Sequence, residues 1–283
     1  MKPVQLSSGR AMPSLGLGTW NMGENDARRQ QEIRALQSGL DLGMNLIDTA
    51  EMYGDGGAEE VVGEAIQGRR DSVYLVSKVY PHNATVRGVQ LACERSLQRL
   101  KTDYLDCYLL HWRGSVPLAE TLDGLQALKR AGKIRDYGVS NFDLDDMEQA
   151  RSLPGGKDIV TNQVLFNLTR RGIEWNLLPW SQQHNVPVMA YSPLESSTPG
   201  EQRVLLGNRT LQAVAERHGA TPAQIALAWL LRQDQVIVIP KSSNPEHVQL
   251  NRKAADIVLT AEDLADLDKG FPRPRKGTPL DMR

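Results

Sequence analysis

The sequence predicts an α/β protein: a (β/α)8 TIM barrel with an N-terminal hairpin and a short C-terminal tail. Short apolar runs alternate along the chain with segments whose apolar residues recur at helical spacing. Eight strand–helix units in 283 residues average about 35 residues each, close to the roughly 30 that one βαβ unit needs. A closed barrel best satisfies eight right-handed crossovers. Because no change of composition divides the chain, residues 1–283 are predicted to form one barrel domain.

The predicted strands are runs that are mostly too short for helices and rich in β-branched or aromatic residues, as buried parallel strands are. Before them, Val4–Met12 is expected to form a small hairpin at the bottom of the barrel, with Ser8 and Gly9 at its middle. The barrel strands are predicted at Leu15–Gly18, Leu46–Asp48, Val73–Lys78, Tyr104–His111, Ile134–Ser140, Ile159–Gln163, Pro187–Tyr191 and Val236–Pro240.

The segments between the strands are predicted to be helices, because their apolar residues recur every three or four positions, as in Ile33, Leu36 and Leu40. Thr221 followed by Pro222 predicts an N-cap and the first residue of a helix. A last helix is expected near Ala261–Lys269. The prolines and glycine of Ser192–Gly207 favour a mobile loop over a helix there.

The charge balance argues against nucleic-acid or membrane partners, because 33 lysines and arginines oppose 34 aspartates and glutamates. The chain begins without the apolar segment of a signal peptide, and no apolar run approaches the roughly 20 residues of a membrane helix. Two cysteines, Cys93 and Cys107, are too few for disulfide bonds to stabilise a fold of this size. A cytoplasmic protein that needs no metal is therefore expected.

Polar or hydrogen-bonding residues end all eight predicted strands. In a parallel barrel these ends converge on the one face that carries active sites. Any one of them could be structural, but eight together favour a functional face. The strand-end residues are Gly18 and Thr19, Asp48, Lys78, His111, Ser140 and Asn141, Gln163, Tyr191, and Lys241.

Asp48, Lys78 and His111 at strand ends, together with Tyr53 in a glycine-rich loop, form a candidate acid–base set. A neighbouring cation favours a phenolate, so Lys78 is expected to lower the pKa of Tyr53. Asp48 would keep Lys78 charged, and His111 would donate to and orient a carbonyl oxygen. Asp48 could instead be an N-cap, Tyr53 an exposed aromatic and His111 a core histidine, but a lysine is rarely buried without a partner.

Motifs along essentially the whole chain resemble those of the aldo-keto reductase family, in the family's order. Each motif alone is modest evidence for the resemblance, and the motifs together are strong evidence for it. They lie at Ile47–Gly54, Val76–Lys78, Leu109–Trp112, Gly138–Phe142, Asn162–Val164, Ala190–Leu194 and Ile239–Pro245. Asp48–Tyr53, Leu153–Gly156 and the short C-terminus are similar to the bacterial methylglyoxal-reductase-like branch.

The resemblance implies an NADPH-dependent oxidoreductase that reduces aldehydes or reactive dicarbonyls to alcohols. In the family, the matches of four residues are catalytic: Tyr53 donates the proton, Lys78 lowers its pKa, Asp48 pairs with Lys78, and His111 orients the substrate. A nicotinamide cofactor delivers hydride to the carbonyl carbon. No strand-linked GxGxxG is present, which argues against a Rossmann site.

The cofactor contacts implied by the resemblance fit the chemistry of the side chains. Amides and hydroxyls suit the carboxamide, Tyr191 offers a stacking face, and Ser192 begins a loop that would fold over the pyrophosphate. The family usually has arginine where this chain has His247, so we expect a smaller preference for NADPH over NADH. The candidate residues are Gly18, Thr19, Trp20, Asp48, Ser140, Asn141, Gln163, Tyr191, Ser192, Pro193, Leu194, Pro240, Lys241, Ser242, Ser243, His247 and Asn251.

The substrate pocket is expected to be aromatic and sulfur-lined, which suits small or apolar carbonyl compounds without selecting one. The short tail, Phe271–Arg283, is expected to leave this pocket open. The predicted lining residues are Trp20, Met22, Met52, Tyr53, His111 and Trp112.

Two other hypotheses stay open from the sequence. The barrel could be a cofactor-binding redox-sensing subunit without significant turnover, or an isomerase or aldolase in which Lys78 forms a Schiff base. The complete acid–base set favours the reductase over both. A monomer acting on a small-molecule carbonyl substrate is expected, because no extra interface element is evident.

Overall fold

The protein is a parallel β-barrel surrounded by helices, as the sequence predicts. We describe a computed structural model, which covers residues 2–195 and 199–283. Eight parallel strands follow one another around the sheet in chain order, from β3 to β10. The barrel strands are β3 (Gly16–Gly18), β4 (Leu46–Asp48), β5 (Tyr74–Val79), β6 (Leu105–Leu110), β7 (Ile134–Ser140), β8 (Ile159–Leu165), β9 (Val188–Tyr191) and β10 (Val236–Val238).

The first and last barrel strands meet through short parallel contacts that close the sheet. Leu15 pairs with Val238 and Gly18 with Lys241, and the Gly18 N–H donates to the Pro240 carbonyl over 3.0 Å. Gly18 has no space for a side chain, because a Cβ would lie 2.8 Å from the Ile239 carbonyl oxygen. Closure therefore brings the ends of β3 and β10 side by side.

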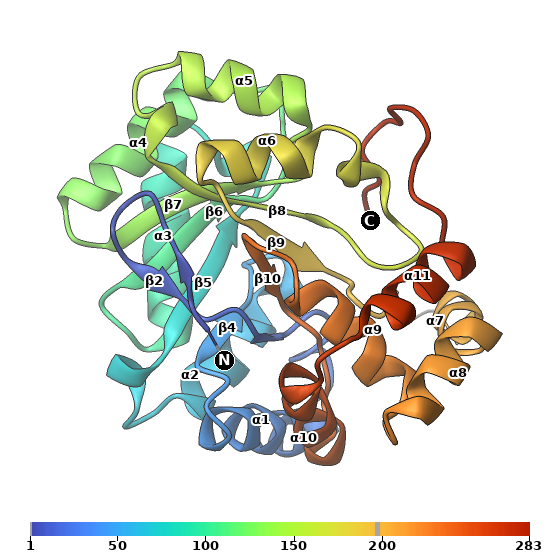
Figure 1. The fold of residues 1–283 in the computed structure, drawn as a ribbon. Coiled ribbons are helices and arrows are strands. Elements are labelled where there is room, and N and C mark those ends of the chain that lie inside the picture. Colours follow the sequence, from blue (N-terminus) through green and yellow to red (C-terminus); the bar gives the residue numbers. More distant parts are fainter. Residues whose placement is uncertain (1, 196–198) are drawn as a thin grey trace.

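A ring of helices covers the outside of the barrel (Figure 1). Most helices start at a side-chain cap, and the Thr221–Gln224 capping box with Pro222 begins α9 as predicted. The helices are α1 (Asp26–Asp41), α2 (Gly57–Ala65), α3 (Val86–Leu100), α4 (Leu118–Arg130), α5 (Leu144–Ser152), α6 (Leu177–His184), α7 (Pro199–Leu206), α8 (Arg209–Arg217), α9 (Pro222–Leu231), α10 (Pro245–Lys253) and α11 (Ala261–Gly270).

The N-terminal hairpin, β1 (Val4–Gln5) with β2 (Ala11–Met12), closes one end of the barrel. Its Leu6 and Met12 belong to the apolar cluster that fills the barrel interior, together with residues such as Val76 and Met189. A second, larger cluster lies between the strands and the helices. The barrel interior is therefore a packed core and not a binding cavity. In such barrels the active site lies at the end opposite the hairpin, where the strands have their carboxyl ends.

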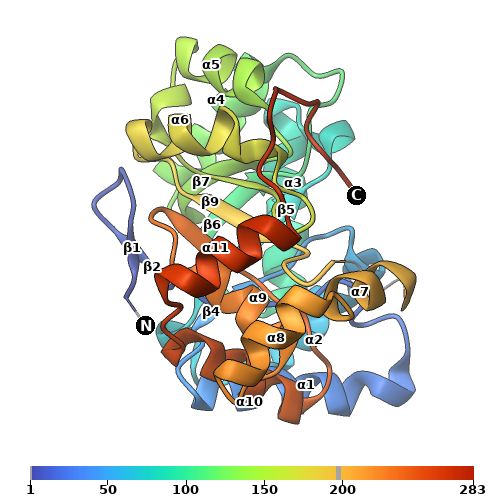
Figure 2. The same ribbon diagram turned by 45° about the vertical axis from the view of Figure 1, so that its right-hand side comes forward.

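The tail is at the other end of the barrel from the hairpin (Figure 2). After α11 the chain runs along the face that carries α5 and α6 and turns back toward the strand ends. None of the helices within the described residues combines the length and hydropathy that a membrane span requires.

The prediction of a loop over Ser192–Gly207 is wrong in part. Residues 196–198 of that stretch lie outside the described residues, and Pro199–Leu206 forms helix α7. Proline is well tolerated in the first turn of a helix, where its missing N–H costs no hydrogen bond. A proline followed by glycine therefore marked the start of a helix here.

Candidate active site

The candidate site is built around the ammonium group of Lys78 at the carboxyl ends of β4 and β5. Lys78 has no exposed surface, and its Nζ donates three hydrogen bonds: to Asp48 Oδ2 over 2.8 Å, to the Thr49 carbonyl over 2.8 Å and to the Tyr53 hydroxyl over 2.9 Å. All three protons of the ammonium group are thus used. The acid–base set predicted from the sequence is brought together in space.

Two backbone segments in contact hold Tyr53 in place. Tyr53 begins a short 3₁₀ turn, Tyr53–Gly56, which leads into α2. Gly23, after β3, touches the first residue of α2 so closely that a Cβ on Gly23 would lie 2.1 Å from the Gly57 carbonyl carbon. Gly23 also has φ +72°, which favours glycine. These glycines allow the two loops to pack and so fix the approach of Tyr53 to Lys78.

The predicted direction of the Tyr53 pKa shift is wrong. Burial raises the pKa of Tyr53 well above its ordinary value, and the charge of Asp48 raises it further. Burial lowers the pKa of Lys78, while the charges of Asp48 and Glu59 act in the opposite sense. Because the Asp48 carboxylate already compensates the ammonium charge, Lys78 does not overcome the cost of burying a phenolate.

His111 lies against Tyr53 as a neutral imidazole. The two ring centroids are 5.8 Å apart in an edge-to-face arrangement. Burial, followed by the charge of Lys78, lowers the pKa of His111 to about 2. Its Nδ1 is buried and has no hydrogen-bond partner among the described residues. At neutral pH the ring therefore carries one N–H donor and one acceptor.

A polar platform continues from the catalytic set across β7, β8 and β9. The Gln163 Nε2 donates to Asp48 Oδ1 over 2.7 Å, and the Ser140 hydroxyl donates to the Gln163 carbonyl over 2.8 Å. The Asn141 Nδ2 donates to the His111 carbonyl over 3.2 Å, and its Oδ1 accepts from the Tyr191 hydroxyl over 2.9 Å. Asn141 has φ +59°, a left-handed conformation that asparagine tolerates better than most residues.

Three of the predicted cofactor residues, Gly18, Thr19 and Pro240, are buried framework. Thr19 has no exposed surface, and its hydroxyl donates to the Asp48 carbonyl over 3.0 Å. Gly18 and Pro240 join β3 to the end of β10. Thr19 thus connects the end of β3 to the residue that holds Lys78.

The start of the β9–α7 connection also lies at this face. Ser192 has φ +47°, an unusual conformation for serine, and its carbonyl accepts from Asn167 Nδ2 over 2.9 Å. Pro193 is buried and Leu194 half-buried. A residue whose backbone adopts the left-handed conformation at a strand end turns the chain sharply, here across the mouth of the barrel.

A second group of predicted cofactor residues lies next to β10, at the start of α10. Lys241 is exposed, and the Ser242 hydroxyl lies within a turn closed by Asn244, which caps α10. His247 is exposed in the first turn of α10. Ser243 is half-buried, and Asn251 is buried further along this helix.

The predicted substrate residues divide into a rim and a core. Trp20 is 46% exposed and lies edge-on to Tyr53, with ring centroids 5.0 Å apart. Trp112 is half-buried beside His111, at 4.9 Å, and Met52 is half-buried. Met22, in contrast, is fully buried in the main core. Its predicted pocket role is therefore not supported, because the whole side chain packs inside the core.

Sequence reasoning missed two features of the rim. Tyr80 packs edge-to-face on Trp112 at 5.8 Å and stacks on His82 at 4.7 Å. The signal was present, because Tyr80 directly follows the end of β5, at the face where the strand ends converge. The other missed feature is Arg283, whose backbone N–H donates to the Tyr191 hydroxyl over 3.2 Å, so the tail reaches the site that it was expected to leave open.

The described residues hold no cluster of histidine, cysteine and acidic side chains suited to a metal ion.

Comparisons with known proteins agree with this architecture. A family model described as the aldo/keto reductase family matches residues 14–270. Methylglyoxal reductase YeaE of Escherichia coli K12 is 50% identical over 282 residues, which are 99% of each chain. An aldo/keto reductase from Klebsiella pneumoniae, crystallised with NADP and acetate, is 51% identical with a TM-score of 0.97, covering 100% of this chain and 99% of that one. A Klebsiella pneumoniae aldo-keto reductase in complex with NADPH is 52% identical with a TM-score of 0.96 over the same shares.

Proposed function

Because this chain belongs to the aldo/keto reductase family, we propose that it reduces aldehydes and reactive dicarbonyl compounds such as methylglyoxal to alcohols, with NADPH as the reductant. The observation that carries the proposal is the donation of Lys78 Nζ to both Asp48 and the Tyr53 hydroxyl. The 50% identical relative is named a methylglyoxal reductase, and the two Klebsiella structures contain NADP or NADPH, which supports both substrate class and cofactor.

The donor set of the site fits a nicotinamide dinucleotide phosphate. Ser140, Asn141 and Gln163 provide amide and hydroxyl groups suited to the carboxamide, beside the Tyr191 ring. At the other end, exposed Lys241 and the neighbouring hydroxyls of Ser242 and Ser243 offer a cation and hydrogen-bond donors to a 2′-phosphate. When bound, this cofactor supplies the hydride.

Tyr53 is the proton donor in this proposal. Its raised pKa keeps the phenol protonated at neutral pH, ready for the alkoxide oxygen that hydride addition creates. An alkoxide is a stronger base than a phenolate, so the transfer is favourable. As the proton leaves, the buried Lys78 hydrogen bond at 2.9 Å stabilises the phenolate oxygen.

Lys78, Asp48 and His111 prepare this step. Asp48 and the Thr49 carbonyl fix the ammonium group, so no side chain must reorganise when charge develops. His111 is neutral, and its N–H can polarise and orient the carbonyl oxygen without competing for the Tyr53 proton. Trp20 and Trp112 flank this position with apolar surface.

The test is NADPH oxidation by the wild-type protein across methylglyoxal, other dicarbonyls, simple aldehydes and ketones, with NADPH binding measured in parallel. The proposal predicts NADPH binding and turnover that favours aldehydes and dicarbonyls. Binding without turnover would support a cofactor-binding redox-sensing subunit instead. Borohydride trapping of a Lys78 adduct with a keto substrate would support a Schiff-base enzyme.

A further inference from the structure

The C-terminal tail ends in a cluster of charged side chains beside the polar platform of the site. We call Arg170, Glu195, Glu201, Asp281 and Arg283 the tail cluster. Arg283 Nη2 lies 2.5 Å from Glu195 Oε2 and 2.7 Å from Glu201 Oε2. Arg170 lies 3.3 Å from Glu195, 3.2 Å from Glu201 and 3.8 Å from Asp281. Two arginines from different segments thus share two glutamates.

Glu195 is the buried centre of this cluster. Only 3% of its side chain is exposed, and it accepts from Arg170, Arg283 and the Thr169 hydroxyl. A carboxylate with so little solvent requires paired charges and hydrogen bonds. Glu195 follows β9 by four residues, so the tail cluster fixes the chain just beyond Tyr191.

The backbone of Arg283 also extends the hydrogen-bond chain of the platform. Its N–H donates to the Tyr191 hydroxyl, which donates to Asn141 Oδ1. The Asn141 Nδ2 in turn donates to the His111 carbonyl. Burial raises the pKa of Tyr191 to about 12, so its hydroxyl keeps the proton that it donates.

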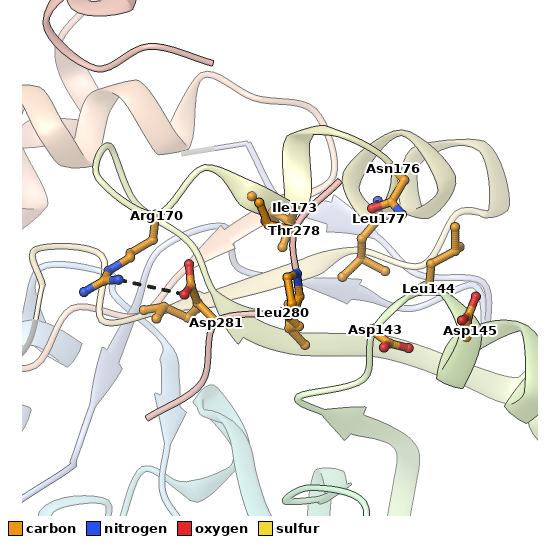
Figure 3. A pocket seen from close by; sticks show the side chains of 13 residues that line it. Asp143, Leu144, Asp145, Arg170, Ile173, Asn176, Leu177, Thr278, Leu280 and Asp281 are labelled. Carbon is orange, nitrogen blue, oxygen red and sulfur yellow. Dashed lines mark hydrogen bonds and ion pairs between the residues drawn. The ribbon is translucent and has the colours of Figure 1, made fainter. Parts of the chain in front are cut away.

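Most residues of the tail after Phe271 are exposed, so the charged cluster at its end contributes much of what holds it in place. Figure 3 shows Thr278 and Leu280 next to Ile173, and Arg170 reaching Asp281. A cavity of about 210 Å³ lies between the tail and these residues. A segment that bridges a cavity gains little from packing, and charged contacts then decide where its end lies.

We propose that Arg283 is a positioning residue for the nicotinamide end of the cofactor, acting through the Tyr191 hydroxyl. Its guanidinium anchors the tail on Glu195 and Glu201, and its N–H holds the Tyr191 ring at the angle set by Asn141. Arg283 touches neither the reacting atoms nor the adenosine end. This inference rests on the proposed function, because it assigns a role around the same cofactor.

The experiment compares Arg283→Ala with the wild-type protein and with Arg275→Ala, a control at an exposed arginine of the same tail. We expect Arg283→Ala to raise the Kd for NADPH roughly three- to tenfold through faster dissociation, measured by stopped-flow tryptophan fluorescence. The variant should fold, because Glu195 keeps Arg170. Arg283→Lys should recover part of the affinity, and Arg275→Ala should match the wild type.

A fragment of the cofactor separates positioning from a general structural defect. Adenosine 2′,5′-bisphosphate occupies only the adenosine end, so its Kd should be the same for Arg283→Ala and the wild type. Tyr191→Phe keeps the ring but removes the hydroxyl, and Arg283→Ala/Tyr191→Phe should bind NADPH no more weakly than the worse single variant.

Equal NADPH affinity of Arg283→Ala and the wild type would overturn the positioning role while leaving the proposed function intact. Equal weakening of NADPH and the bisphosphate, or additive effects in the double variant, would also overturn it. A wild-type protein that binds no NADPH would refute the proposed function and, with it, this inference.

Discussion

Two lysines at strand ends, Lys78 in β5 and Lys241 beyond β10, follow the same sequence pattern but have opposite environments. Lys78 is fully buried, and the protein supplies all three of its hydrogen-bond acceptors. Lys241 is exposed next to Gly18 and the start of α10. The protein itself thus accepts all three hydrogen bonds of the Lys78 ammonium group, whereas the Lys241 ammonium group faces solvent.

The difference indicates how the two ends of the site divide their tasks. A catalytic group gains from being held in its working geometry beforehand, because no reorganisation is then needed during the reaction. A binding group at the surface forms its contacts only with the ligand and tolerates substitution of its neighbours. Changes near Lys78 should therefore affect kcat and stability, whereas changes near Lys241 should affect cofactor affinity alone.

The largest effect is expected for Lys78→Met, which removes the ammonium group and leaves the Asp48 carboxylate buried without its charge partner. We expect kcat to fall by about two to four orders of magnitude. The free energy of unfolding should drop by about 3–5 kcal/mol, measured by urea denaturation. Lys133→Met, at an exposed lysine, is the control and should change neither quantity. Wild-type kcat in Lys78→Met would refute the role assigned to the buried cation.

A smaller and more selective effect is expected for Lys241→Ala. Loss of a charge-assisted contact should raise the Kd for NADPH about ten- to a hundredfold, because hydrogen bonds to charged groups contribute about 1.5–3 kcal/mol. NADH lacks the 2′-phosphate, so its Kd should not change, and neither should kcat at saturation nor thermal stability. Isothermal titration with both cofactors, beside Lys276→Ala as a control, measures this. An equal loss for NADPH and NADH would show that Lys241 does not contact the 2′-phosphate.

The smallest effect is expected for His247→Arg in the first turn of α10. An arginine adds a permanent charge and a planar donor group. Exposed ion pairs contribute about 0.2–1 kcal/mol, so the ratio of kcat/KM for NADPH over NADH should rise about two- to fivefold. Gln249→Arg adds the same charge to an exposed position of that helix and should leave the ratio unchanged. A ratio that rises equally in both variants would show that the added charge acts through the overall electrostatic potential of the protein and not through a local contact with the cofactor.

Much of the barrel could be predicted because its strands are short, apolar and buried. The predicted bounds Leu46–Asp48 and Ile134–Ser140 are those of β4 and β7, and the hairpin lies within Val4–Met12. The convergence of strand ends on one face of a parallel barrel also predicted that Asp48 and Lys78 would meet. Short continuous apolar runs suffice to predict these strands because both faces of each strand are buried.

The predictions that failed depend on a balance of opposing energies or on contacts between residues far apart in the sequence. The Tyr53 pKa depends on the balance of burial, Lys78 and Asp48, which residue types alone do not determine. The contact between Arg283 and Tyr191 joins residues 92 positions apart through a tail without periodic pattern. The predicted pocket role of Met22 fails because its side chain is buried in the main core, which a residue type alone does not reveal.

The most direct test of the central claim is the kcat of Tyr53→Phe for methylglyoxal reduction, with NADPH affinity measured on the same protein. Phenylalanine keeps the ring between Trp20 and His111 and removes only the hydroxyl that Lys78 contacts. The account predicts a kcat at least about a hundredfold lower with an unchanged Kd for NADPH. A Tyr53→Phe protein that turns over at the wild-type rate would contradict it.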